Sequence, residues 1–277
     1  SDYNNNSLSL RMDAKLDDTS SLRLGIHHKS IDANSYSRYT LQASGYRQKE
    51  LFNDWSITYN FKEKSETPGY LRYFDNYRWE DWSGSFDSRL QGIDYQNGWN
   101  LGKYHKLIVG AEWHHSISNN SASGAYDDKT ITNKAAYLQD KIHLADKWSL
   151  VPGIRVDHHS MFGTHWTPKI AVNYNANNKT QVYASWGRVY KAPTADDLYY
   201  NNAACMMYGN ENLQPETGYT ESVGINHQFD SKTSIQASVF QSEIHDAIYW
   251  LFNSSTYESH VANISREKKR GFELSFQ

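Results

Sequence analysis

Apolar and polar residues alternate along much of this chain with a period of two. Successive side chains of a β-strand point to opposite faces, so this alternation predicts strands with one apolar and one polar face. The alternating segments are 7–16, 21–28, 55–61, 107–113, 150–156, 170–174, 182–186, 223–229, 235–239 and 272–276. Helical spacing competes nowhere over a comparable length. We expect about thirteen strands of roughly ten residues each, longer than the usual strand.

The connections between these strands are predicted to be of two kinds. Tight polar turns are expected at 17–20, 102–105, 145–147, 176–179 and 230–232, with a looser turn near 48–54. Longer connections are expected at 30–37, 63–82, 118–133, 160–165, 191–216 and 246–263. A regular exchange of short turns and long loops is typical of outer-membrane barrels.

The expected strand length also fits a membrane. Ten residues rise about 33 Å, and a tilt of roughly 45° reduces this to about 23 Å, close to the apolar band of such a barrel. The apolar face would then meet lipid, and Arg11, Asp13, Arg23, Arg155 and Asp157 would point into the lumen. A large soluble β protein is the competing interpretation, because its core strands alternate too.

Composition narrows the class of protein to which this chain can belong. The chain has 277 residues, 14% of them aromatic, and a mean hydropathy of −0.79. No apolar stretch approaches the ~18 residues of a transmembrane helix. A net charge of −3 provides no basic field, so nucleic acid is not an expected partner. The single Cys205 excludes an internal disulfide framework and a Cys-rich metal site.

The chain carries none of the common enzyme motifs, so we expect neither an enzyme nor catalytic residues. Adjacent histidines occur at 27–28, 114–115 and 158–159. Neighbours on a strand point to opposite faces and cannot chelate one ion, so each pair should place one ring in the lumen and one near the interface. We therefore expect no metal and no cofactor.

Two motifs frame the longest predicted loop. The first is Y-K-A-P, which contains Lys191, Ala192 and Pro193, and the second is G-N-x-x-L-x-P-E at 209–216. The second motif supplies Gly209, Asn210, Leu213, Pro215 and Glu216. With the segments 162–174 and 263–277, this part of the chain resembles the barrel of TonB-dependent outer-membrane receptors. The first half of the chain matches that family in pattern alone.

The resemblance implies an all-β fold, an antiparallel transmembrane β-barrel. Residues 1–277 would form a single partial barrel domain, truncated at both ends, with about 13 of about 22 strands and no plug domain. It implies a receptor in the outer membrane of a Gram-negative (diderm) bacterium, in contact with lipid. Such a receptor imports a scarce nutrient complex with energy from the TonB complex, which it contacts through a plug. A passive porin-like or adhesin-type barrel is the alternative.

The ligand would be a siderophore first, with haem and cobalamin open. Loop residues rich in aromatic rings and sulfur are the candidates for ligand contact: Tyr199, Tyr200, Cys205, Met206, Met207, Tyr208, Tyr77 and Trp79. Thiolate and thioether groups are soft ligands that suit haem iron or Cu(I). Residues 194–208 contain no histidine, which disfavours haem. The same residues also suit an adaptable contact surface, and each motif residue taken singly is expected to shape the loop.

Overall fold

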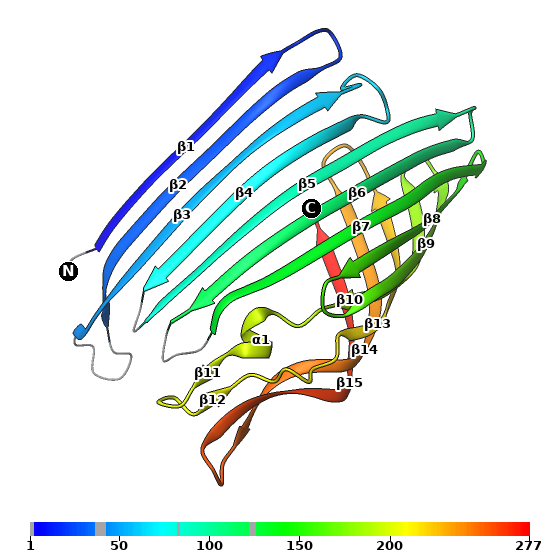
Figure 1. The fold of residues 1–277 in the computed structure, drawn as a ribbon. Helices are drawn as coiled ribbons and strands as arrows, with labels where there is room; N and C mark the ends of the chain where they lie inside the picture. Colours follow the sequence, from blue (N-terminus) through cyan, green and yellow to red (C-terminus); the bar gives the residue numbers. More distant parts are fainter. Residues whose placement is uncertain (1–2, 37–42, 82–83, 122–125) are drawn as a thin grey trace.

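The computed structural model describes residues 3–36, 43–81, 84–121 and 126–277. They form one sheet in the order β1 to β10, β13, β14, β15, β12, β11 (Figure 1). Every long strand pairs antiparallel with its neighbours, as the alternating pattern predicts. The described residues contain no helix long and apolar enough to cross a membrane.

The strands occupy most of the chain. Their bounds are β1 Tyr3–Lys15, β2 Ser21–Tyr36, β3 Ala43–Phe61, β4 Gly69–Asp81, β5 Ser85–Leu101, β6 His105–Asn120, β7 Tyr126–Ala145, β8 Trp148–His159, β9 Gly163–Asn177, β10 Thr180–Lys191, β13 Glu216–Gln228, β14 Ser234–Asn253 and β15 Glu258–Phe276. Between β10 and β13 lie α1 Ala195–Tyr199, β11 Asn201–Asn202 and β12 Met207–Tyr208. Apart from the two-residue β11 and β12, the described strands number thirteen, in agreement with the expected count.

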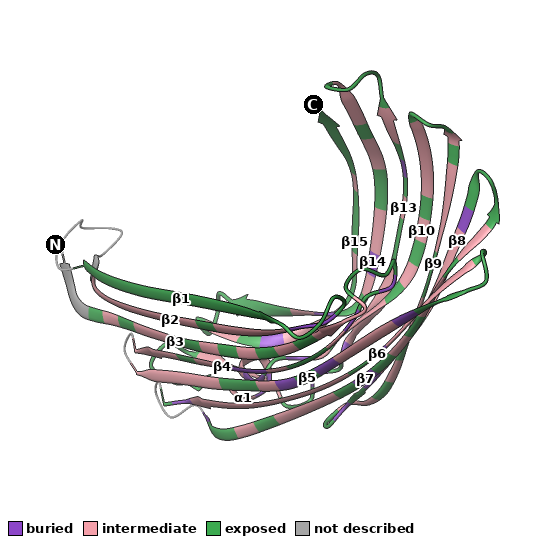
Figure 2. Ribbon diagram, turned by 90° about the horizontal axis from the view of Figure 1, so that it is seen from above, coloured by how far each residue is buried: buried purple, intermediate pink, exposed green. Residues whose placement is uncertain are grey.

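The sheet is curved from one strand to the next. It bends gently over β1 to β7 and more sharply from β8 to β15, so that one face is concave and the other convex (Figure 2). Among the described residues, β1 pairs with β2 alone, and the strand pairing on the free edge of β15 is limited to Met207 and Tyr208 of β12. The described sheet is therefore an open segment of a barrel wall.

Short turns gather at one end of the sheet, which we call the turn end. Connections 16–20, 102–104, 146–147, 178–179 and 229–233 lie there, as expected. The connection 62–68 also lies at the turn end. Residues 63–82 were expected to form one long loop, but they contain the strand β4, so only a short turn precedes it. The segment 48–54, expected to be a turn, lies inside β3. Trp82 lies outside the described residues.

The opposite end, the loop end, differs from the expectation. Strands run for 12 to 20 residues instead of about ten, because neighbouring strands stay paired far beyond the apolar belt. The strands therefore absorb most of the predicted loops 30–37, 118–133 and 246–263. Among the described connections, 192–215 alone stays long, and it agrees with the predicted loop 191–216 to within one residue at each boundary.

β4 shows why the alternation failed as a signal. Tyr73 and Phe74 are adjacent aromatic residues on opposite faces, and Asp75 places a charge on the convex face. Arg89 of β5 neutralises that carboxylate, with Nη2 2.5 Å from Oδ2. Pairing between strands thus stabilises a strand whose own sequence does not place apolar residues on one face.

The convex face carries an apolar belt close to the turn end. On β9 the belt consists of Ile170 and Val172, with Trp166 on one side and Tyr174 on the other. Leu8 and Leu10 of β1 are 62% and 46% exposed on the same face. Aromatic rings that border an exposed apolar band are the girdles of a membrane barrel. The face that carries Leu8, Leu10, Leu24, Ile170 and Val172 is thus the lipid face.

Candidate functional site

The connection 192–215 is a folded structure on the loop end of the sheet. Thr194 caps α1: its hydroxyl accepts a hydrogen bond from the Asp197 backbone N–H at 3.1 Å, and the Asp197 carboxylate accepts one from the Thr194 N–H at 2.9 Å. This reciprocal capping satisfies backbone donors at the start of the helix. After α1, β11 and β12 form a short hairpin, and β12 runs parallel to β15 through Met207 and Tyr208.

Gly209 and Asn210 close this loop on itself. The Gly209 N–H donates to the Tyr200 carbonyl at 2.6 Å, and the Asn210 N–H donates to the Asp197 carbonyl at 2.8 Å. A Cβ atom at position 209 would lie 2.9 Å from three backbone atoms of residues 197, 198 and 200. The glycine is required for this close approach of two backbone segments.

The other motif residues also hold the loop in place. Leu198, Leu213 and Val261 form a small hydrophobic core, each 1% exposed, and Pro193 is buried as fully. Pro215 is buried where β13 begins, and Ala192 is half-buried. Lys191 forms an ion pair with Glu216 at 3.2 Å, and Glu216 accepts the Ile248 N–H at 2.9 Å. The motif residues therefore shape the loop, as expected for each of them taken singly.

A polar contact fastens α1 to the neighbouring strands. Tyr126, which begins β7 and is 7% exposed, donates its hydroxyl to Asp196 Oδ1 at 2.7 Å. Burial, followed by the Asp196 carboxylate, raises the pKa of this phenol well above its ordinary range, so Tyr126 stays a donor at neutral pH. The sequence pattern did not identify this contact, because Tyr126 and Asp196 lie 70 positions apart.

Aromatic rings surround the loop. Tyr200 meets Trp250 of β14 with ring centroids 5.9 Å apart, and Tyr208 stacks on His260 of β15 at 5.1 Å. The Lys129 ammonium lies 4.1 Å from the ring centre of Tyr199. Lys129, Trp250 and His260 were not among the expected residues, because each belongs to a strand extension that was predicted as a loop. Residues 260 and 261 are neighbours on β15, so His260 and Tyr208 lie on the opposite face from Val261, Trp250 and Tyr200. We call Tyr199, Tyr200 and Trp250, which lie on the side of Val261, the aromatic platform.

The sulfur-bearing residues lie at the tip of the hairpin. Cys205 and Met206 are exposed, whereas Met207 is half-buried beside β15. The described residues contain no group of three His, Cys, Asp or Glu side chains placed to hold a metal ion. The tip therefore presents soft, mobile side chains to solvent without a formed coordination site.

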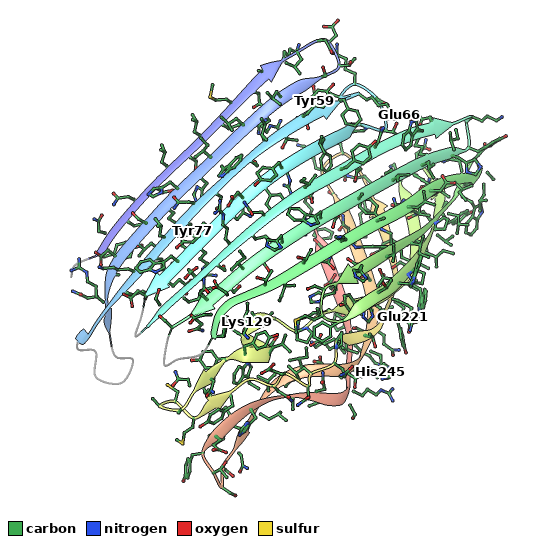
Figure 3. All side chains as sticks on the ribbon, in the orientation of Figure 1. Tyr59, Glu66, Tyr77, Lys129, Glu221 and His245 are labelled. Atoms are coloured by element: carbon green, nitrogen blue, oxygen red, sulfur yellow. The ribbon has the colours of Figure 1, made fainter. Side chains whose placement is uncertain are left out.

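Tyr77 and Trp79 do not lie in a loop, which corrects that prediction. Both belong to β4 and share the convex face with Tyr73, and Figure 3 labels Tyr77 on this strand. Trp79 donates its indole N–H to Ser85 at 2.7 Å. The predicted loop that contained Tyr77 and Trp79 is a strand of the wall, so these two residues do not belong to the aromatic platform.

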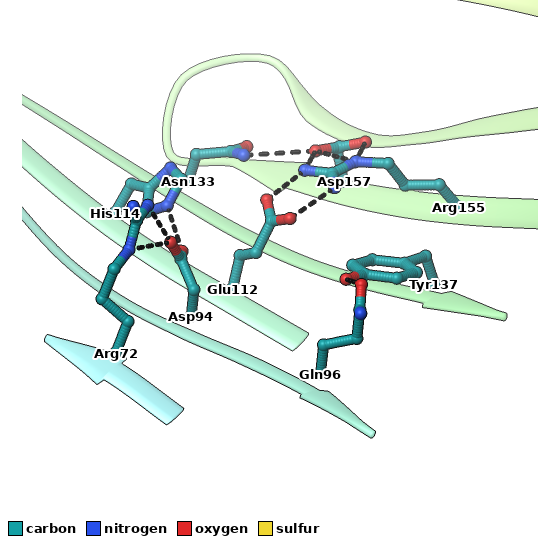
Figure 4. A network of polar contacts seen from close by, with 9 residues as sticks. All are labelled: Arg72, Asp94, Gln96, Glu112, His114, Asn133, Tyr137, Arg155 and Asp157. Carbon is teal, nitrogen blue, oxygen red and sulfur yellow. Dashed lines mark hydrogen bonds and ion pairs between the residues drawn. The ribbon is translucent and has the colours of Figure 1, made fainter. Parts of the chain in front are cut away.

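A chain of charged residues crosses the concave face (Figure 4). Arg155 of β8 donates to Glu112 of β6 at 2.7 and 3.0 Å and to Asp157 at 2.9 Å. Asp94 of β5 accepts from Arg72 at 2.5 Å and contacts His114 Nε2 at 2.8 Å. Arg155 reaches Glu112 across β7, and this face lies opposite the apolar belt, so it is the lumen.

The histidine pairs divide as predicted. His114 faces the lumen on Asp94, and its neighbour His115 stacks against Trp113 on the convex face at 5.8 Å. Arg11, Asp13 and Arg23 form ion pairs on one face, opposite the apolar one, which confirms their expected direction.

A long antiparallel wall with an apolar convex belt, aromatic girdles and a charged concave face is a segment of a transmembrane β-barrel. The whole chain, residues 1–277, matches the family described as TonB dependent receptor-like, beta-barrel. The chain belongs to this family of Gram-negative outer-membrane receptors. The short turns accordingly mark the periplasmic end and the aromatic platform the extracellular end.

Several relatives show what this chain is similar to. It is 30% identical over 188 residues to the vitamin B12 transporter BtuB of Photobacterium profundum, covering 66% of this chain and 29% of that protein. It is 26% identical over 273 residues to BtuB of Vibrio vulnificus, covering 94% and 42%. The ferric enterobactin receptor PirA of Pseudomonas aeruginosa is 29% identical over 160 residues, covering 45% and 21%. The chain spans less than half the length of these relatives.

Solved structures share the fold. The siderophore receptor PirA from Pseudomonas aeruginosa superimposes with a TM-score of 0.85 at 19% identity, covering 99% of this chain and 53% of that one. The Serratia marcescens hemophore receptor HasR, solved with its hemophore HasA and heme, gives a TM-score of 0.81 at 15% identity, covering 99% and 52%.

Proposed function

We propose that residues 1–277 form a single barrel domain, part of the wall of an active-transport receptor. This receptor captures a scarce nutrient complex at its extracellular end and imports it with energy from TonB. The observation that carries the proposal is the folded loop 192–215, a buried scaffold that presents the aromatic platform at the extracellular end. A passive pore has no need for such a structure, and the family membership argues against it.

The open edges of the sheet support a larger barrel. The outer edge of β1 has no strand beside it among the described residues. Unpaired backbone groups cost several kcal/mol each in lipid, so the wall has to be closed by further strands. We propose a barrel of about 22 strands around a plug that contacts TonB.

The chemistry of the platform supports a large, flat or aromatic ligand. Tyr and Trp rings offer wide contact area at a low cost in side-chain entropy. Tyr200 is fixed by Trp250, so it is already positioned before a ligand arrives. A ferric siderophore with aromatic iron-binding groups fits best, and cobalamin and haem are the alternatives that the test includes.

Capture and transport make or break no bond in this proposal. The charged side chains of the lumen neutralise one another in ion pairs, as Arg155 does with Glu112 and Asp157. We therefore propose no catalytic activity and no resident cofactor.

The test uses the full-length receptor that carries this chain. Uptake of radiolabelled ferric enterobactin, cyanocobalamin and haemin is measured in cells with and without TonB, and binding to the purified receptor is measured by calorimetry. We expect saturable uptake of one compound that requires TonB. Deletion of residues 201–207 should reduce the affinity for that compound at least tenfold.

The control is Lys232→Ala, in a periplasmic turn far from the platform. It should bind and transport as the unmodified receptor does. Equal uptake with and without TonB would contradict active transport. Unchanged affinity after the deletion would show that the hairpin does not contact the ligand, whatever the transport result.

A further inference from the structure

The convex face of β10, β13, β14 and β15 is arranged in rows across the strands. Residues directly opposite each other in an antiparallel sheet share a face, so the strand register defines each row. The row in the apolar belt contains Ala184, Val223, Val239 and Phe272. The next row toward the extracellular end contains Trp186, Glu221, Gln241 and Arg270, and the row after that contains Arg188, Tyr219, Glu243 and Lys268.

A groove of 590 Å³ lies over these rows and over the adjoining part of β9. Its apolar lining includes Ile170, Val172, Ala184, Val223 and Val239, and Arg270 and Glu221 line its polar side. Small side chains at 184, 223 and 239 leave this depression beside the bulky Trp186. We call it the β10–β15 groove, and Figure 3 labels Glu221 on this part of the wall.

Positive charge exceeds negative charge along the extracellular rim of the groove. The convex face there carries Arg188, Arg266, Lys268 and Arg270 against Glu221 and Glu243. Glu243 is shared by Arg266 at 2.7 Å and Lys268 at 3.5 Å, so one carboxylate serves two cations. Glu221 is the other carboxylate, and it accepts a hydrogen bond from Gln241 without forming an ion pair among the described residues, so two cations remain without an ion pair.

Arg188 and Arg270 are these two cations. Arg188 is exposed and forms no ion pair with any residue that the structure describes. Arg270 donates its Nε–H to the neutral Gln241 side chain at 2.6 Å. The convex charges of β4 and β5 differ, because Asp75 neutralises Arg89 through bonds of 2.5 and 3.0 Å. Neither Arg188 nor Arg270 has such a carboxylate partner among the described residues.

The place of the groove determines what can occupy it. Its apolar part lies within the belt that faces hydrocarbon, and Arg188 and Arg270 lie on the extracellular side of Ala184 and Phe272 along their strands, toward the lipid headgroups. Guanidinium groups with free donors match phosphate oxygens in geometry and charge. We propose that the β10–β15 groove binds a phosphorylated lipid of the outer leaflet, with an acyl chain along Val223 and Val239 and phosphate on Arg188 and Arg270.

This proposal is independent of the transported ligand. The test uses the full-length receptor in detergent and follows lipid adducts by native mass spectrometry. The probes are synthetic bisphosphorylated lipid A, the same glycolipid without phosphates, and inorganic phosphate. We expect bisphosphorylated lipid A to bind at least tenfold more tightly than its dephosphorylated form.

The double variant Arg188→Gln/Arg270→Gln removes charge without leaving a carboxylate unpaired. It should lose about tenfold in affinity for bisphosphorylated lipid A, because charge-assisted hydrogen bonds to phosphate are stronger than those between neutral groups. Lys134→Gln is the matched control: Lys134 is an exposed cation on the convex face, opposite Trp113 and away from the groove, and its variant should bind as the unmodified receptor does. Val239→Trp fills the groove and should weaken binding with the charges intact.

Equal affinity of the double variant and the unmodified receptor would overturn the proposal. So would equal binding of the dephosphorylated glycolipid, or full displacement of lipid A by inorganic phosphate, which would identify an anion site without lipid recognition. Folding of the double variant is judged by its migration in gel electrophoresis without heating. If it does not fold, the single variants Arg270→Gln and Val239→Trp test the proposal in its place, with the same outcomes.

Discussion

Gly209 contributes through its missing side chain. Its Cα lies where the ends of α1 and of the β11–β12 hairpin meet, and hydrogen bonds on both sides fix the backbone. Recognition of the G-N-x-x-L-x-P-E motif located this position in the sequence. The residues that Gly209 contacts could not be predicted from the sequence. The close approach involves backbone atoms of residues 197 to 200, and no pattern of side chains encodes it.

Gly209→Ala should loosen the loop. The added Cβ would lie 2.9 Å from backbone atoms that cannot yield as a flexible side chain can, so we expect a local cost of about 1–3 kcal/mol. Hydrogen exchange of the amides of Gly209 and Asn210 should accelerate about tenfold or more. Ala204→Ser, at the exposed hairpin tip, is the control and should leave exchange unchanged. Unaltered exchange in Gly209→Ala would contradict the role of close packing.

Asp17 provides a prediction on pH. Its carboxylate accepts the Ser20 hydroxyl at 2.6 Å and the Thr19 N–H at 2.7 Å, and these hydrogen bonds lower its pKa from 3.8 to about 2. A carboxyl whose pKa is depressed by folding stabilises the folded state fully above its unfolded pKa and loses this effect as the pH falls through its folded pKa. The contribution of Asp17 is therefore complete above pH 4 and lost near pH 2.

Asp17→Asn should accordingly lower the urea midpoint of unfolding at pH 7, and the difference should vanish near pH 2. The comparison with Asp18→Asn is the control, because Asp18 is exposed and accepts no hydrogen bond among the described residues. A difference that persists at pH 2 would contradict the assignment to the ionised carboxylate.

Among the elements, α1 depends on its neighbours. A helix of five residues is too short to be stable alone, and its capping box satisfies donors without supplying much free energy. The Tyr126 hydroxyl, the Asn210 side chain and the buried Leu198 bind it to β7, β15 and the loop core. The platform is therefore rigid through tertiary contacts.

Asp196→Asn tests this attachment. The amide retains an acceptor for Tyr126 but loses the negative charge, so we expect a cost of about 1 kcal/mol. Hydrogen exchange over residues 195–208 should increase roughly fivefold. Glu211→Gln removes an exposed charge from the same loop and should have no effect. If both variants exchange alike, the Tyr126 contact does not hold the helix.

The strands also show where prediction from the apolar–polar pattern fails. β1 and β2 alternate strictly, and both were predicted from the sequence. β4 was predicted as a loop because Phe74 and Tyr73 face opposite sides and the Asp75–Arg89 pair lies on the convex face. Pairing across the sheet determined this element, and a single strand does not contain that information.

At the scale of the whole molecule, the two faces of the wall define the class of protein. Strand alternation and family motifs were sufficient for the fold and for the direction of the charged face. They were insufficient for the platform, because Trp250 approaches the loop through β14, which pairs with β15 far beyond the membrane belt. Rings so distant in sequence meet through the geometry of the complete wall.

Cysteine scanning of the full-length receptor tests the two faces. With Cys205 first replaced by serine, single cysteines at Leu8, Leu10, Leu24, Ile170 or Val172 should resist an aqueous maleimide in intact membranes, because lipid covers them. Cysteines at Arg11 and Arg23 should react. Comparable labelling of both sets would contradict the barrel assignment.

The parallel contact between β12 and β15 also bears on the order in which the molecule is built. Nearly every strand pairs with the one before it in the chain, so the wall can assemble hairpin by hairpin as the polypeptide becomes available. The hairpin at residues 201–208 is different, because its partner residues 259 and 260 come some fifty positions later. The segment that faces the outside therefore gains this partner only once β15 is in place. A receptor halted before β15 joined the wall would keep its other long strands paired while its recognition surface lacked this support.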